Sequence, residues 1–157
     1  MIVAGTGHRP DKLGGYSADV YSRLVNTAIE WLNENRVMAV ISGMALGWDQ
    51  ALAEAALATG KPFYAYIPFK GQESKWPSES QKNFHRLIEK ASCIVECSEP
   101  GYAAWKMQHR NKRMVDDCDL VLALWNGSEG GTANCVAYAE KCGKPIVNLW
   151  PQYHATE

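Results

Sequence analysis

Short apolar runs alternate along the chain with longer stretches in which apolar residues recur at helical spacing. The runs predict six strands, at residues 2–4, 38–42, 63–67, 93–96, 120–124 and 145–149. The stretches between them predict helices at residues 17–32, 48–59, 78–90, 102–117 and 133–141. Ser17 is a residue type that caps helices, and Gly60 and Gly143 stand where two helices are expected to end.

This alternation of strands and helices predicts an α/β fold. Strands that are apolar along most of their length and joined by helices are typical of a mostly parallel sheet with both faces covered. We therefore expect a Rossmann-like, three-layer α/β/α sandwich, with residues 1–157 forming a single domain. Ligands bind such sheets outside the carboxyl ends of the strands, so the loops at those ends are the candidates for a site. The pattern does not predict the order of the strands.

The composition disfavours several classes of protein. The formal net charge is -1, whereas proteins that bind nucleic acid usually carry a basic surface, so we do not expect a nucleic-acid partner. No run of about 18 apolar residues and no signal-peptide pattern is present, which predicts a cytoplasmic protein without a membrane span. The five cysteines stand mostly beside apolar residues and are typical of reduced thiols.

The segment at residues 42–49 joins a predicted strand to an alanine-rich helix and contains two glycines. Unpaired backbone N–H groups and the helix dipole favour an anionic group at such a turn, and glycine lets that group approach closely. Asp49 either stabilises the first helical turn or contacts ligand, and it is also a candidate acid or base. The predicted ligand-binding residues of this segment are Ser42, Gly43, Met44, Ala45, Gly47, Trp48 and Asp49.

Two further glycine-rich loops follow predicted strands near the two ends of the chain. The first offers a hydroxyl, an imidazole and the planar guanidinium of Arg9, and the second opens a helix, so both suit phosphate. The alternative is that the glycines only turn the chain and that Arg9 is solvated. The predicted ligand-binding residues are Gly5, Thr6, Gly7, His8 and Arg9 in the first loop, and Asn126, Gly130, Gly131, Thr132 and Asn134 in the second.

The loop at residues 68–77 is too rich in glycine and proline to be regular. Phe69 and Trp76 are candidates to stack on a base, and Gln72 is a candidate to bind its edge. The alternative is a surface loop held together by its own aromatic residues.

Basic residues and methionines recur together on the predicted helix at residues 102–117. From spacing alone, Arg110 and Arg113 suit a solvated basic face with Met107 and Met114 buried beneath it. No metal site or cofactor is expected, because the histidines are scattered without ligand spacing and Cys93 and Cys97, although four positions apart, belong to a predicted strand.

Taken together, these motifs resemble the SLOG superfamily, which groups DNA-processing protein A with the lonely-guy phosphoribohydrolases. Residues 42–49 are similar to the Ser-Gly-Gly-Ala-x-Gly-x-Asp turn of the DNA-processing branch, and residues 130–132 to the glycine-threonine cradle of the lonely-guy branch. Met107, Arg110 and Met114 match the helix motif of the lonely-guy branch, in which Arg110 falls on the catalytic arginine. The resemblance implies a Rossmann-like fold, a nucleotide-type ligand that Arg110 contacts, and a homodimer or higher homo-oligomer. It is strongest to short bacterial and phage members.

One departure from the lonely-guy motif bears on catalysis. Asn134 stands where those enzymes place a glutamate that assists cleavage of the N-glycosidic bond, and an amide cannot act as a base. An enzyme would therefore have to use Asp49 or Glu129 as its acid or nucleophile.

The sequence favours a protein that binds a small nucleotide or nucleotide-derived ligand, such as an ADP-ribose-like molecule or a cyclic nucleotide, as a sensor or sequestering protein. The alternative is an enzyme that cleaves or transfers at the N-glycosidic bond of a nucleotide, as a phosphoribohydrolase does. Single-stranded DNA binding, as in the DNA-processing branch, is the third hypothesis and agrees least with the net charge.

Overall fold

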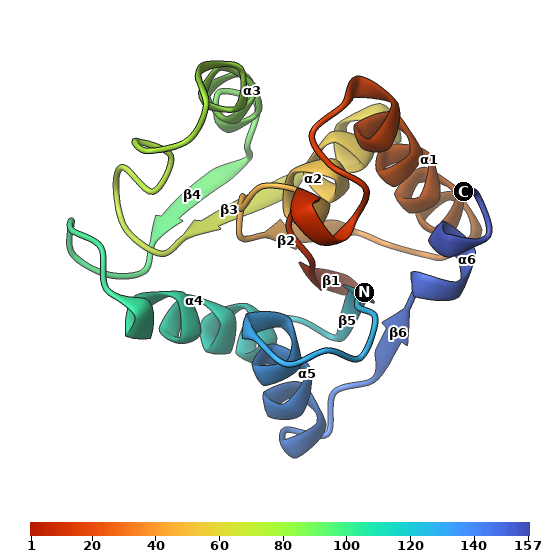
Figure 1. Ribbon diagram of the computed structural model, residues 1–157. Coiled ribbons are helices and arrows are strands. Elements are labelled where there is room, and N and C mark those ends of the chain that lie inside the picture. Colours follow the sequence, from red (N-terminus) through yellow and green to blue (C-terminus); the bar gives the residue numbers. More distant parts are fainter.

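Six parallel strands form one sheet in the computed structural model, which describes residues 1–157 (Figure 1). The strands are β1 (Ile2–Gly7), β2 (Ala39–Ser42), β3 (Phe63–Ile67), β4 (Cys93–Glu96), β5 (Leu120–Leu124) and β6 (Ile146–Asn148). The helices are α1 (Ala18–Glu34), α2 (Trp48–Ala58), α3 (Ser78–Ile88), α4 (Ala104–Asp117), α5 (Gly131–Lys141) and α6 (Trp150–His154), with a short 3-10 helix, η1 (Pro10–Lys12). Every pair of neighbouring strands is parallel, which confirms the predicted Rossmann-like fold.

The order of the strands is β4-β3-β2-β1-β5-β6. From β1 the chain moves outward through β2 and β3 to β4, and then returns to the other side of β1 as β5. The connections that leave the carboxyl ends of β1 and β5 therefore diverge to opposite faces, which opens a crevice at that point of the sheet.

Helices cover both faces of the sheet, as Figure 1 shows. On one face α1 and α2 pack together, with α6 beside α1 and α3 beside α2, while α4 and α5 cover the other face. The larger hydrophobic cluster lies beneath α1 and α2 and includes Leu24, Leu52 and Phe63. The smaller one lies against α4 and α5 and includes Ile41 and Met114. No helix of this fold combines the length and the apolar character that a membrane crossing requires.

Local sequence accounts for the start and the orientation of α1. The side-chain hydroxyl of Ser17 accepts a hydrogen bond from the backbone N–H of Val20 at 3.2 Å, as expected of a helix cap. Leu24, Ala28 and Leu32 then recur at the spacing of one helical face and are buried in the larger cluster.

Strand β1 is longer than the sequence predicts, because it continues beyond residue 4 to Gly7. Gly5 and Gly7 pair in register with Leu122 and Leu124 of β5, so the expected loop is a strand. The structure also contains α6, which the pattern does not predict, because it is a single short turn with a proline. The other boundaries differ from prediction by a few residues, which is ordinary for helix and strand ends.

The glycines of β1 serve helix packing rather than a turn. A Cβ atom at Gly5 would lie 2.5 Å from a methyl carbon of Leu52, and one at Gly7 would lie 2.5 Å from the ring of Trp48. Such distances are far inside van der Waals contact, so α2 lies directly on β1 only because both positions lack a side chain. The N-terminus of α2 is thereby held beside the end of β1.

Candidate ligand-binding site

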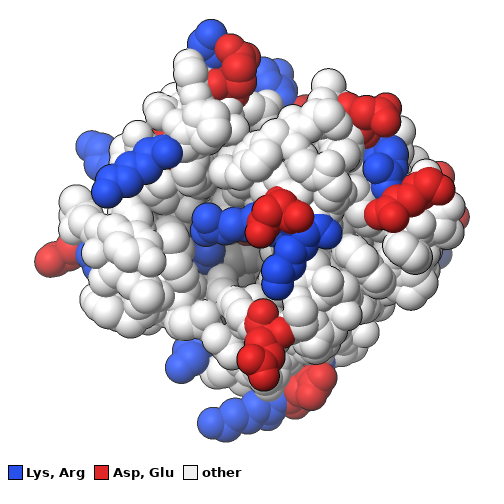
Figure 2. All heavy atoms as spheres, in the orientation of Figure 1, with Lys and Arg blue, Asp and Glu red and all other residues white.

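A polar cavity of about 270 Å³ lies at the carboxyl ends of β1 and β5, where the strand order reverses. Figure 2 shows the hollow near the centre of this face, with basic and acidic side chains along its edge. Many predicted site residues line it: Gly5, Thr6, Gly7, His8, Arg9, Ala45, Asp49, Arg110, Glu129, Gly130, Gly131 and Thr132. The structure therefore brings the three glycine-rich segments and Arg110 of α4 to one place.

The other predicted residues lie outside the lining of this cavity: Ser42, Gly43, Met44, Gly47, Trp48, Phe69, Gln72, Trp76, Asn126 and Asn134. Several of them order the loops instead. The hydroxyl of Ser42 donates to the carbonyl of Asp49 at 2.7 Å and accepts from the N–H of Met44 at 3.1 Å, which fixes the turn between β2 and α2. The amide of Gln72 donates to the carbonyl of Gly43 at 3.2 Å.

The aromatic residues predicted for the site, Trp48 and the two candidates for base stacking, Phe69 and Trp76, also pack elsewhere. Trp48 is fully buried, and its ring N–H donates to the carbonyl of Leu122 at 3.2 Å. Phe69 packs edge-on against Tyr102, and Trp76 packs edge-on against Phe84. The cavity consequently has no tryptophan, tyrosine or phenylalanine among its lining residues.

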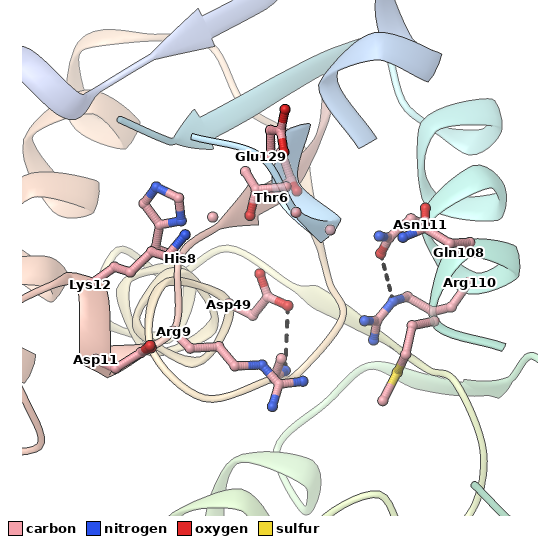
Figure 3. A pocket seen from close by; sticks show the side chains of 17 residues that line it. Thr6, His8, Arg9, Asp11, Lys12, Asp49, Gln108, Arg110, Asn111 and Glu129 are labelled. Atoms are coloured by element: carbon pink, nitrogen blue, oxygen red, sulfur yellow. Dashed lines mark hydrogen bonds between the residues drawn. The ribbon is translucent and has the colours of Figure 1, made fainter. Parts of the chain in front are cut away.

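Arg110 is held by backbone carbonyls. Its Nη1 donates to the carbonyl of Gly43 at 2.7 Å and to that of Tyr66 at 3.3 Å. Figure 3 shows the third bond, in which Nε donates to Oδ1 of Asn111 at 2.9 Å. The residue is 5% exposed, so the alternative of a solvated basic face is wrong at this position. A Cβ atom at Gly43 would lie 2.6 Å from Nη1, so the glycine makes room for the guanidinium. No protein group accepts from Nη2, which leaves that nitrogen available to a ligand.

Asp49 is a buried carboxyl at the first turn of α2. Burial raises its pKa to about 6, although the guanidinium of Arg110, the N–H of Ala45 and the guanidinium of Arg9 each act in the opposite direction. The N–H of Ala45 lies 3.4 Å from Oδ2. Burial likewise lowers the pKa of Arg110, and the Asp49 carboxylate partly offsets this. The two groups thus stabilise one another's charge beside the cavity.

Asp49→Asn should remove part of the pH dependence of folding. A carboxyl whose pKa rises from 3.8 to about 6 on folding binds a proton more readily in the folded chain, so its contribution to stability falls as pH rises through this window. The free energy of unfolding of the variant should therefore change less across the window, by up to about 1.4 kcal/mol per pH unit relative to the unsubstituted protein. Urea unfolding at a series of pH values measures this difference. Parallel curves for the two proteins would contradict it.

The N-terminus of α5 supplies unpaired backbone donors to the cavity. The first bond of this helix runs from the N–H of Asn134 to the carbonyl of Gly130, so the N–H groups of Gly131 and Thr132 have no partner within the helix. Gly130 adopts a φ of 139°, which favours glycine, and no side chain caps the helix. Free N–H groups, with the helix dipole behind them, attract an anion.

Side-chain hydrogen bonds of Lys12 and His8 connect the loop after β1 to the loop after β5. Nζ of Lys12 donates to the hydroxyl of Ser128 at 3.0 Å. Nε2 of His8 contacts both the backbone N–H of Asn126, at 3.0 Å, and Oδ1 of the same residue, at 2.9 Å. Burial lowers the pKa of His8, which favours its neutral ring. These bonds close one side of the cavity.

Five lining residues were missed from the sequence: Asp11, Lys12, Met107, Gln108 and Asn111. Met107 is three positions before Arg110 and four before Asn111, so helical spacing places Met107 beside both of them. Lys12 and Asp11 lie in η1, a short 3-10 helix where the sequence predicts only a loop. The full lining has three basic residues, Arg9, Lys12 and Arg110, and three carboxylates, Asp11, Asp49 and Glu129. No group of three histidine, cysteine or acidic side chains suits a metal ion.

The reversal of strand order, the polar cavity and the helix N-terminus beside it are those of a Rossmann-like ligand-binding protein. The family match assigns the chain to the SLOG superfamily, which confirms the resemblance. More specifically, the chain belongs to the DNA recombination-mediator protein A family, whose model matches residues 15–156.

Comparison with known proteins agrees with this assignment. The chain is 29% identical over 150 residues to the uncharacterized SPbeta prophage-derived protein YoqJ of Bacillus subtilis, covering 84% of this chain and 88% of that protein. Among solved structures, DNA processing protein A of Streptococcus pneumoniae has a TM-score of 0.69 at 20% identity, covering 93% of this chain and 49% of that one. The chain thus spans about half the length of the pneumococcal protein.

Two further structures share the fold. DNA processing protein A of Helicobacter pylori, described for its single-stranded DNA binding mode, has a TM-score of 0.67 at 20% identity, covering 94% of this chain and 64% of that one. The molybdenum cofactor carrier protein of Chlamydomonas reinhardtii has a TM-score of 0.57 at 16% identity, covering 94% of this chain and 74% of that one.

Proposed function

We propose that the cavity binds a small phosphate-bearing ligand of the nucleotide class, such as an ADP-ribose-like molecule or a cyclic nucleotide, and that the protein acts as a sensor or sequestering protein. The observation that carries this proposal is the convergence of the α5 N-terminus with three basic side chains. Arg9 offers a planar pair of donors, which suits phosphate oxygens, and Arg110 offers its Nη2, the one guanidinium nitrogen without a protein acceptor. The carrier protein from Chlamydomonas supports the idea that this fold holds a small ligand.

An enzyme acting at the N-glycosidic bond of a nucleotide is the second candidate. Asp49 favours it, because a buried carboxyl with a pKa of about 6 is suited to proton transfer near neutral pH. Asn134 weighs against it, since this residue is exposed and outside the cavity, and brings no carboxylate there.

Single-stranded DNA is the third candidate, because the family and the Helicobacter structure are associated with DNA. The net charge of -1 and the equal numbers of acidic and basic residues in the cavity weigh against tight binding of a long polyanion. Fluorescence anisotropy with a labelled oligonucleotide tests this candidate directly. A homodimer or higher homo-oligomer is also part of our proposal, and sedimentation velocity measures it.

Native mass spectrometry of gently purified protein, followed by calorimetry with AMP, cyclic AMP and ADP-ribose, tests the main proposal. A ligand that is recovered unchanged in a ratio of one per chain supports binding without turnover. Free base released in excess over protein supports the enzyme instead. Failure of all three nucleotides and of inorganic phosphate to bind would refute the proposed site.

Gly131→Ala should weaken a phosphate-bearing ligand by about 10-fold, which corresponds to about 1.4 kcal/mol. The nearest atom to the added Cβ would be Nε2 of Gln108 at 3.9 Å, so the folded chain has room for it. A ligand, however, would lose its close approach to the N–H groups of α5. Calorimetry measures the affinity, and an unchanged unfolding midpoint serves as the control. Equal affinities of the two proteins would remove the α5 N-terminus from the site.

A further inference from the structure

A second cavity, of about 330 Å³, lies among the N-terminal ends of α1, α2 and α3. It shares no lining residue with the first cavity, but the two are neighbours along the chain. Arg9 lines the first and Pro10 the second, and in the same way Ala45 lines the first and Leu46 the second. These two short segments therefore form the wall between the cavities.

The second cavity differs from the first in charge. No lysine or arginine is among its lining residues, whereas three line the first cavity. Its single carboxylate, Glu79, is exposed at the start of α3 and forms an ion pair with Lys82 at 3.2 Å. Without cations to balance it, a phosphate group is not favoured here.

Uncharged polar groups line one side of this second cavity. Gln50 is 3% exposed, and its Nε2 reaches its acceptor, the carbonyl of Met44, only at 3.5 Å. Nδ2 of Asn83 donates to the hydroxyl of Tyr21 at 3.3 Å and to Oε1 of Gln50 at 3.0 Å. Since amide hydrogen bonds are ordinarily close to 2.9–3.0 Å, two of these three bonds are long. The side-chain amide N–H groups of Gln50 and Asn83 can therefore form shorter hydrogen bonds with an acceptor on a ligand.

An aromatic ring stands at the rim. The side chain of Tyr16 is 64% exposed although it lines the cavity, and it follows Gly14 and Gly15, both of which have positive φ. A Cβ atom at Gly15 would meet nothing within 4 Å, so there is open space beside this residue. Leu24 and Leu46 supply an apolar wall. An exposed ring together with apolar lining residues suits a flat ligand that stacks.

We propose that the second cavity binds an uncharged, flat heterocycle of the nucleobase or nucleoside class. Asparagine and glutamine amides match the donors and acceptors on base edges, and tyrosine stacks on any base. The lack of cations selects against the phosphorylated forms that the first cavity suits.

Calorimetry with adenosine and with uridine tests this assignment, because neither probe carries a phosphate. We expect at least one to bind with a Kd of about 1 mM or lower. Tyr16→Ala should weaken that binding at least about 5-fold, the factor that corresponds to the loss of about 1 kcal/mol of stacking. The matched control is Tyr102→Ala, which removes a 74% exposed tyrosine that lines neither cavity and should change the affinity less than about 2-fold.

Three outcomes would overturn the proposal. One is the absence of binding by both nucleosides at concentrations of about 5 mM, well above the expected Kd. Another is an equal effect of the two tyrosine variants. The last is a loss of nucleoside binding in Gly131→Ala with none in Tyr16→Ala, which would place the nucleoside in the first cavity. Because the probes lack phosphate, failure here is distinct from failure of phosphate binding at the α5 N-terminus.

Discussion

Gly47→Ala is expected to destabilise the protein by at least about 3 kcal/mol and to lower its Tm by roughly 6–12 °C. Gly47 precedes α2 with a φ of 89°, a conformation that residues with a side chain rarely adopt. A Cβ atom there would also lie 2.5 Å from the backbone carbonyl oxygen of His8. That oxygen accepts a hydrogen bond from the N–H of Trp48 at 3.2 Å, so it cannot move away without loss of the bond. Thermal unfolding measures the effect.

Gly71→Ala is the matched control for this variant. Gly71 also has a φ of 89°, but a Cβ atom there would meet nothing within 4 Å. It should therefore cost only the backbone strain, about 1–2 kcal/mol. The difference between the two variants measures the contact between the start of α2 and the end of β1. Similar losses for both would mean that this contact contributes nothing.

Arg110→Ala is expected to reduce stability by about 2–4 kcal/mol and to weaken a phosphate-bearing ligand by about 1.5–3 kcal/mol, or roughly 10- to 150-fold. The variant loses the charged hydrogen bonds to the carbonyls of Gly43 and Tyr66. It also removes the guanidinium that opposes the rise in the pKa of Asp49. Urea unfolding measures the first effect, and calorimetry with AMP the second.

Arg113→Ala is the control on the same helix. Arg113 is half-buried, lies over the ring of Tyr66 at 5.9 Å from its centroid, and does not line the cavity. Its removal should cost less than about 1 kcal/mol and leave the ligand affinity unchanged. If both arginine variants bind AMP as tightly as the unsubstituted protein does, Arg110 has no part in binding.

The fold was predictable from the sequence because strand and helix periods alternate clearly. What the pattern could not provide was the pairing of strands, since β1 pairs with β2 and β5 through contacts far apart in sequence. The extension of β1 to Gly7 was missed for a related reason. Glycines are typical of turns, and only the packing of Trp48 and Leu52 against them explains their place in a strand.

The candidate site was predictable in its loops and less so in its side chains. Loops at the carboxyl ends of parallel strands meet at one edge, so the glycine-rich segments were correctly expected to lie together. Spacing alone suggested a solvated Arg110. The carbonyls that accept its hydrogen bonds belong to β3 and to the loop after β2, which are far from α4 in the sequence. The direction of the Phe69 and Trp76 rings depends on partners in α3 and the loop before α4, which local sequence does not specify.

The wall between the two cavities has a thermodynamic consequence. Since Arg9 and Pro10 are consecutive and face different cavities, any occupant of either one restrains the same peptide unit. Any coupling free energy between the two cavities must be reciprocal. The factor by which a molecule in the first cavity changes affinity in the second equals the factor by which a molecule in the second changes affinity in the first. Two bound molecules would then change each other's binding affinity without direct contact.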